Sequence, residues 1–179
     1  MSNQIVRPLV SGTVAMFFGW LATTTSAISQ TGECRLVADD RNPSEQILRC
    51  GDDLVVRATP GTRYHPVDQQ GNQPPKALQL DTGALMIEFH PNNMQKDFQI
   101  LTPQAVAAVR GTKWVVDVSG ARTSTLVISG EVAVVGLHAD KTVVLKPGEG
   151  ADISAGTDSF AAKRWPEERV RALLARFGE

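Results

Sequence analysis

Short apolar runs separated by glycine dominate the chain from about residue 47 to about residue 153. The runs are rich in valine, leucine and isoleucine and are too short for ordinary helices, which is typical of β-strands. Five segments repeat one plan, in which a run leads through a glycine into a second run: residues 47–51 into 54–56, 78–83 into 85–89, 106–111 into 114–118, 125–130 into 132–135, and 143–148 into 151–153. The pattern predicts an all-β fold.

The glycines of the last three segments are regularly spaced. Gly111, Gly130 and Gly148 lie 19 and 18 residues apart. Such spacing is typical of solenoid-like coils, each of which buries its apolar face against its neighbours. Short strands with regular turns also fit a β-sandwich or roll, so both arrangements of stacked short strands stay open, with the solenoid favoured. In either case each glycine supplies a turn or bulge with positive φ, or a close backbone approach.

The C-terminus follows a different pattern, which predicts one short α-helix over residues 166–177. Its apolar side chains recur at helical spacing from Val170 to Phe177, Pro166 suits the first helical position, and Gly178 can end the helix. The apolar face of this helix must pack against another surface. We expect the helix to cap the end of the β stack, and the alternative is a helix that binds a partner or a membrane surface.

The N-terminus indicates export. Arg7 is the only charged residue before Glu33, and the apolar run 9–22 is interrupted by serine, threonine and glycine. A membrane-spanning helix needs about 20 apolar residues, and small polar residues follow up to Ala27, where a signal peptidase could cut. We expect residues 1–27 to be a signal peptide and residues 28–179 to form a single periplasmic domain. If the segment is retained instead, it tethers the protein to the membrane.

Charge and cysteine content narrow the function classes. The formal net charge is −1, so no basic excess favours nucleic acid. Cys34 and Cys50 are the only two cysteines, and in an oxidising compartment we expect a disulfide between them, worth about 3 kcal/mol for a loop of this length. A metal-binding or redox-active thiol pair is the alternative, but the spacing is not that of a CxxC motif.

Residues with catalytic potential are scattered. His65, His90 and His138 have no companion at the spacing of a metal site. Motifs of serine hydrolases, P-loop proteins and dinucleotide-binding enzymes are absent from the sequence. We therefore expect no enzymatic activity, no metal and no cofactor.

Four short motifs occur in order in the second half of the chain. Taken together they resemble the FecR family over roughly residues 50–155. The residues that carry the resemblance are Thr102-Pro103; Arg110-Gly111-Thr112 with Trp114 and alternating valines after it; Gly130-Glu131-Val132-Ala133-Val134; and Leu145-Lys146-Pro147-Gly148-Glu149.

We expect structural roles for these motif residues. Pro103 fixes φ at a strand edge or turn, Gly111 permits a tight reversal, and Thr112 can hydrogen-bond a turn. For Arg110 we expect an internal tie to backbone carbonyls or a carboxylate, and the alternative is a docking point for an anionic ligand or partner. Trp114 alternates with valines, so we expect it in the core rather than as a platform for sugars.

The resemblance implies a β-rich extracytoplasmic domain that transmits signals or makes protein contacts without catalysis. The best-known members of the family regulate iron-uptake sigma factors through a cytoplasmic domain, whereas this chain is expected to be a free-standing periplasmic module without one. We expect a sensing or adaptor role through binding an inner-membrane signalling protein. The alternative is an envelope structural module that binds polysaccharide or peptidoglycan, with Tyr64, His65 and Trp165 as its aromatic candidates; the sequence does not identify ligand-binding residues.

Overall fold

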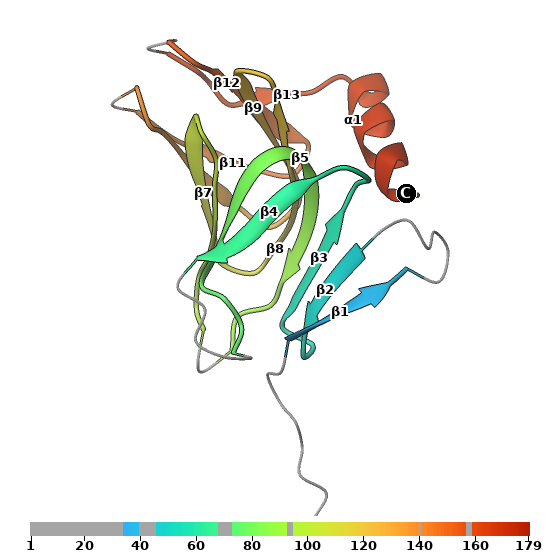
Figure 1. Cartoon of the computed structure of the whole chain (residues 1–179). Coiled ribbons are helices and arrows are strands. Elements are labelled where there is room, and N and C mark those ends of the chain that lie inside the picture. Colours follow the sequence, from blue (N-terminus) through green and yellow to red (C-terminus); the bar gives the residue numbers. More distant parts are fainter. Residues whose placement is uncertain (1–33, 40–45, 68–72, 93–94, 140, 157–158) are drawn as a thin grey trace, which may run out of the picture.

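The computed structural model describes residues 34–39, 46–67, 73–92, 95–139, 141–156 and 159–179. The expected signal segment 1–27 lies outside these residues. The described part contains β-strands and one short C-terminal helix, as expected (Figure 1). The strands are β1 (Cys34–Ala38), β2 (Gln46–Cys50), β3 (Leu54–Ala58), β4 (Arg63–Val67), β5 (Ala77–Phe89), β6 (Phe98–Leu101), β7 (Ala105–Val109), β8 (Thr112–Ser119), β9 (Arg122–Ser129), β10 (Val132–Gly136), β11 (Thr142–Leu145), β12 (Glu149–Ser154) and β13 (Lys163–Arg164), followed by α1 (Glu167–Leu174) and a 3-10 turn (Ala175–Phe177).

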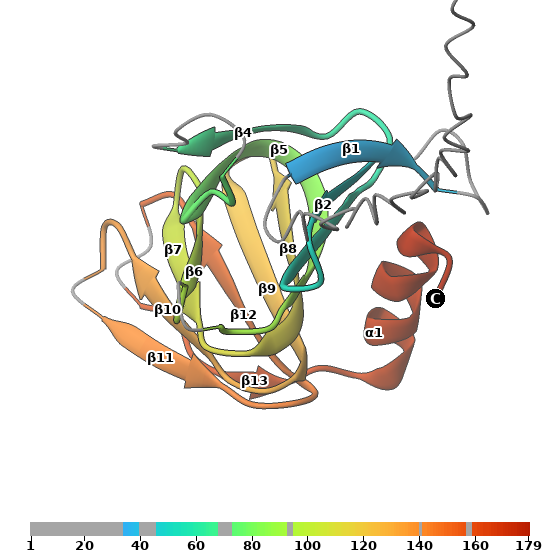
Figure 2. The same cartoon turned by 90° about the horizontal axis from the view of Figure 1, so that it is seen from below.

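All the strands belong to one curled sheet, which forms an open half-barrel (Figure 2). The long strand β5 is shared by its two halves. The C-terminal part of β5 pairs with β3 and β8 and belongs to half A, which also holds β1, β2, β9, β12 and β13. The N-terminal part of β5 pairs with β4 and β6 and belongs to half B, which also holds β7, β10 and β11.

The bend in β5 lies at Gly83, whose φ is +91°. The turn between β3 and β4 packs directly against this glycine, and a Cβ there would overlap the side chain and backbone of Thr62. The same turn satisfies the backbone at the bend, because the amide of Ala84 donates to Oγ1 of Thr62 (3.1 Å) and its carbonyl accepts from the amide of Thr59 (3.1 Å). The strand can therefore change direction without leaving these polar groups unpaired.

Three further glycines lie where the chain crosses from one half of the sheet to the other. Gly111 separates β7 from β8, Gly130 separates β9 from β10, and Gly148 separates β11 from β12. Their φ values are +68°, +80° and +80°, so the expected positive φ is confirmed at all three. The regular spacing seen in the sequence thus records strand pairs that cross between the halves.

The strand pairing is that of a roll. Among the described residues every ladder is antiparallel except the one between β5 and β6. A solenoid would stack successive coils through parallel ladders, so the favoured solenoid-like arrangement is not the one observed. Sequence spacing could not separate the two, because a glycine at a crossing and a glycine at the corner of a coil have the same local conformation.

The concave side of the sheet holds the main core. Trp114 and Phe98 are fully buried there with their ring centroids 6.2 Å apart, and Phe89 lies 5.7 Å from Phe98. Aliphatic side chains from both halves complete the cluster. The curl of the sheet is therefore stabilised by the side chains it encloses.

The C-terminal helix packs on the convex side of half A. Leu173 and Phe177 are buried against Met86, Val115 and Leu126 of the three central strands. Figure 2 shows α1 lying outside the curl, so the helix covers a sheet face and does not cap the end of a stack as expected. No helix within the described ranges is long and apolar enough to cross a membrane.

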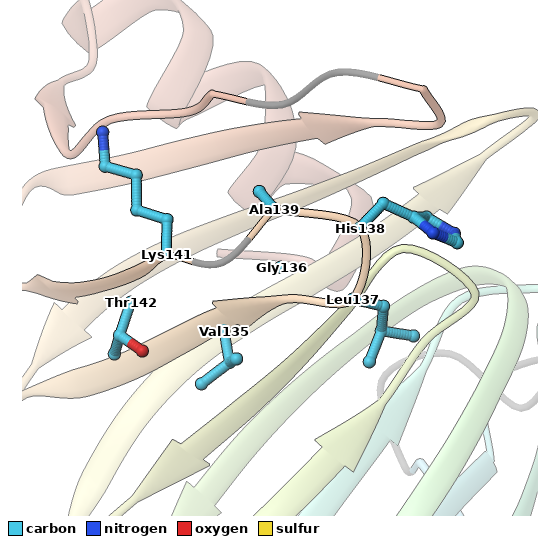
Figure 3. A pocket seen from close by; sticks show the side chains of 7 residues that line it. All are labelled: Val135, Gly136, Leu137, His138, Ala139, Lys141 and Thr142. Carbon is cyan, nitrogen blue, oxygen red and sulfur yellow. The ribbon is translucent and has the colours of Figure 1, made fainter.

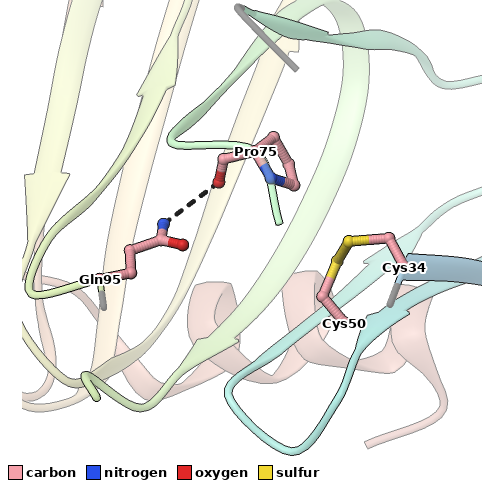
Figure 4. Close-up of a disulfide and its surroundings, with 4 residues drawn as sticks. All are labelled: Cys34, Cys50, Pro75 and Gln95. Carbon is pink, nitrogen blue, oxygen red and sulfur yellow. Dashed lines mark hydrogen bonds between the residues drawn. A yellow bond between two sulfur atoms is a disulfide. The ribbon is translucent and has the colours of Figure 1, made fainter. Parts of the chain in front are cut away.

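The expected disulfide joins Cys34 of β1 to Cys50 of β2 (Figure 4). The two cysteines are directly opposite in the antiparallel register. Cys50 is fully buried in the main core, whereas no residue of β1 is buried. The bond thus fixes an edge strand that has little apolar burial of its own.

Replacing Gly130 by alanine should destabilise the fold by roughly 3 kcal/mol. Alanine at this position would be held at an unfavourable positive φ. Its Cβ would also lie 2.5 Å from the carbonyl oxygen of Gly111. Gly120→Ala is the matched control, since Gly120 also has positive φ but has nothing within 4 Å of its Cβ position, and it should cost about 1 kcal/mol. Urea unfolding of both variants measures the difference, and equal losses would contradict the close packing of the two crossings.

Candidate functional site

Thr102 and Pro103 form the turn between β6 and β7. Thr102 is 3 % exposed, and its Oγ1 donates to the carbonyl of Ala105 (2.8 Å) and accepts from the amide of the same residue (2.9 Å). Pro103 is exposed. The first family motif therefore closes a turn inside the fold.

The same threonine belongs to a buried polar cluster that links the two halves of the sheet. Oγ1 of Thr123, in β9, lies 2.9 Å from Oγ1 of Thr102 and 2.7 Å from Oε1 of Gln104. All three residues are less than 9 % exposed. Buried hydroxyl and amide groups that have hydrogen-bond partners specify one arrangement of the core. Sequence reasoning missed this cluster because Thr123 is 21 residues from Thr102 and 19 residues from Gln104.

Arg110, Gly111 and Thr112 make the crossing from β7 to β8. Thr112 is buried and its Oγ1 donates to the carbonyl of Glu131 (3.4 Å). Arg110 is exposed and forms no hydrogen bond or ion pair with any residue that the structure describes. The internal tie expected for Arg110 is therefore not found, because the crossing directs this side chain into solvent.

The aromatic residues considered for sugar binding are poorly placed for it. Trp114 is fully buried in the core, as expected. Trp165 is 7 % exposed, and the guanidinium of Arg169 lies 3.4 Å from its ring centroid. Tyr64 is half-buried, and desolvation raises its pKa. Of the three candidates only His65 is exposed, and neither Tyr64 nor Trp165 presents a fully open ring that could stack on a sugar.

Ion pairs connect α1 and the 3-10 turn that follows it to half A. Arg169 of the helix binds both carboxylate oxygens of Asp152 (2.5 and 2.8 Å), which also accepts a hydrogen bond from Ser124 (2.6 Å). Arg176 donates to Asp117 (2.9 Å). Burial alone would raise the pKa of Asp152, but the hydrogen bonds from Arg169 and Ser124 and the nearby positive charges outweigh it and lower this pKa.

The hairpin of β10 and β11 carries most of the exposed apolar surface. Val135, Leu137 and Val144 are 40 %, 53 % and 50 % exposed, and Leu36 is the other large apolar side chain in the described chain with comparable exposure. Figure 3 shows Val135 and Leu137 on one side of the hairpin, with Lys141 directed away from them. The sequence pattern did not single out this hairpin, because its valines look like those of any buried strand.

The apolar surface continues from the hairpin across the convex side of half B. The antiparallel register places Val135 opposite Val106 of β7, and Val106 opposite Leu101 of β6. Residues directly opposite in such ladders project from the same face. We call these residues, with Leu137 and Val144, the half B patch; no described helix covers it, unlike the corresponding face of half A.

The histidines are dispersed over the surface. His65, His90 and His138 are all exposed. Among the residues that the structure describes, only His65 has a carboxylate within ion-pair distance, with Nδ1 3.7 Å from Oδ2 of Asp81. Within the described ranges, no three His, Cys, Asp or Glu side chains gather where they could hold a metal ion.

Asp152→Asn should destabilise the protein near neutral pH and have little effect in acid. The folded-state pKa of Asp152 is lowered, so its contribution is fully present above the unfolded-state pKa and is lost as the pH falls through the folded-state value. Solvent screening keeps the contribution below about 1 kcal/mol. Urea unfolding between about pH 7 and about pH 2 measures it. Arg169→Gln should reduce the same pH dependence, because Ser124 and Arg122 also lower this pKa. A pH-independent loss in Asp152→Asn would contradict this origin.

Comparisons with known proteins agree with the architecture. Two crystal structures of a proposed anti-sigma factor from Parabacteroides distasonis, at 1.65 and 2.50 Å resolution, each match with a TM-score of 0.54 and 18 % sequence identity. Each match covers 81 % of this chain and 62 % of that protein, so the chain spans less than two thirds of its length. At this identity the likeness shows the fold alone. Curated protein sequences give no match.

The family is shown by the sequence. The FecR family, described as "FecR protein", matches residues 41–133, which is more than half of the chain. The match includes the motifs from Thr102 to Gly130, whereas Gly148, β1 and α1 lie outside it. The chain belongs to the FecR family.

Proposed function

We propose that this protein is a non-enzymatic periplasmic adaptor or sensor that binds the periplasmic part of an inner-membrane signalling protein. The FecR family is regulatory, and the fold is shared with a proposed anti-sigma factor. These findings support a signalling role in general terms. The choice of a protein partner depends on the surface.

The half B patch is the observation that carries the proposal. Contiguous exposed apolar side chains on a folded protein typically mark sites of protein contact. The three most exposed of them lie on the hairpin of β10 and β11, and neither strand of this hairpin holds a charged residue. A partner with a complementary apolar surface would remove Val135, Leu137 and Val144 from water.

A periplasmic location is supported by the disulfide. Disulfides persist in oxidising compartments such as the bacterial periplasm and are rare in the cytosol. The bond between Cys34 and Cys50 holds the edge of the sheet. The protein is therefore suited to a compartment in which that bond stays oxidised.

In-cell photo-cross-linking from position 137 tests this function. The full-length chain, with a photoreactive amino acid in place of Leu137, should capture an inner-membrane protein with a periplasmic domain, identified by mass spectrometry. The same analysis reads the N-terminus of the protein, and a mature chain starting at Ile28 is expected. Recovery of no membrane protein above background would overturn the proposal, as would co-sedimentation with isolated cell-wall polymer in place of a protein.

Val144→Ser should reduce the capture several-fold, because it removes an apolar contact from the partner surface while leaving an exposed site that tolerates serine. The matched control is Leu36→Ser, which alters an apolar side chain of similar exposure in β1. Equal capture by the two variants would show that the half B patch is not the contact surface. Circular dichroism confirms that both variants are folded.

A further inference from the structure

Two arginines lie directly opposite each other at the edge of half A. Arg35 of β1 and Arg49 of β2 are partners in the antiparallel register, next to the pair formed by Cys34 and Cys50. The cysteine Cα atoms are 4.0 Å apart, the spacing of a non-hydrogen-bonded pair. The adjacent arginine pair is then a hydrogen-bonded one, with Cα atoms about 5.5 Å apart.

Both guanidinium groups belong to the convex face. Side chains alternate along a strand, and Cys50 points into the main core on the concave side. Arg35 and Arg49 therefore project away from that core, Arg35 being exposed and Arg49 half-buried. They occupy half A, whereas the half B patch belongs to the other half of the sheet.

Within the described part of the chain, no acidic side chain neutralises this pair. Neither arginine forms a hydrogen bond or ion pair with a residue that the structure describes. The next residue in the same row is Val55, and beyond it Glu88 is bound to Lys113 (3.2 Å). Two cations directly opposite in a sheet destabilise it, and arginine cannot lose its charge. The arrangement thus lowers stability, and no contact among the described residues offsets the repulsion.

The disulfide fixes the register that places the two arginines opposite each other. It joins the residues immediately preceding Arg35 and immediately following Arg49, so the register cannot slip to separate the two charges. A site that holds two guanidinium groups in place before binding loses less entropy when an anion arrives. The covalent bond therefore preorganises a cationic pair.

We propose that Arg35 and Arg49 form a docking point for a carboxylate group in an acidic segment of a protein partner. Guanidinium groups bind carboxylates through paired, charge-assisted hydrogen bonds. Val37 and Val55 flank the pair on the same face and are half-buried, which favours a polypeptide with apolar side chains beside its acidic residue. This contact surface is separate from the half B patch. It rests on the proposed function only because it takes the partner to be a protein.

Binding of a labelled hexaglutamate peptide to the full-length protein, measured by fluorescence anisotropy at low salt, tests the site. Arg35→Gln/Arg49→Gln should weaken this binding at least fivefold. The matched control is Arg63→Gln/Arg171→Gln, which removes two exposed arginines elsewhere and should leave the affinity within twofold. Inorganic phosphate is the competitor. Displacement of the peptide only at a large excess of phosphate supports a carboxylate site, and equal loss of binding in both double variants overturns it.

The melting temperature gives a second readout. If the two arginines instead stabilised the fold, their replacement would lower the melting temperature. Relief of the like-charge contact should raise the melting temperature of Arg35→Gln/Arg49→Gln by about 1–3 °C. A lower melting temperature would show that the arginines stabilise the fold and would overturn the proposal.

Cross-linking separates the two proposals. If the wild-type chain captures no membrane protein while the peptide binds through the arginines, the proposed function fails and the anion site stands. If the peptide binds both double variants as well as the wild type, the anion site fails alone.

Discussion

The bend in β5 is the constraint on which the rest of the fold depends. One strand takes part in both halves of the sheet because Gly83 can adopt a positive φ and because Thr59 and Thr62 satisfy the backbone at the corner. The crossings from β7 to β8, from β9 to β10 and from β11 to β12 repeat this change of half at a glycine. The curl that results creates a concave side, which becomes the core, and two convex faces, which can be covered or left open.

The two convex faces differ, and the difference has a physical origin. In half A the chain returns with an amphipathic helix, whose Leu173 and Phe177 remove the apolar face from water. Ion pairs around the helix, such as that between Asp152 and Arg169, fix its position but are partly exposed and contribute little stability on their own. In half B no described element covers the convex face, so the valines and leucines of the half B patch stay accessible.

Local features of the fold were predictable from the sequence, whereas sheet partners were not. The strands, the C-terminal helix, the disulfide and the positive φ of Gly111, Gly130 and Gly148 each depend on residues close together in the chain. The choice between a roll and a solenoid depends on which strands pair, which residue spacing does not determine. The exposure of Arg110 and the apolar surface around Val135 depend on that pairing, and the sequence alone could not place them.

The disulfide also determines how the domain responds to mechanical load. Tension applied to the chain before Cys34 would reach the sheet at its edge strand, where hydrogen bonds would otherwise separate one after another. The covalent bond instead transfers the load to Cys50, which is fully buried in the core. Pulling from the N-terminal side therefore acts on the whole domain and cannot peel β1 away by itself.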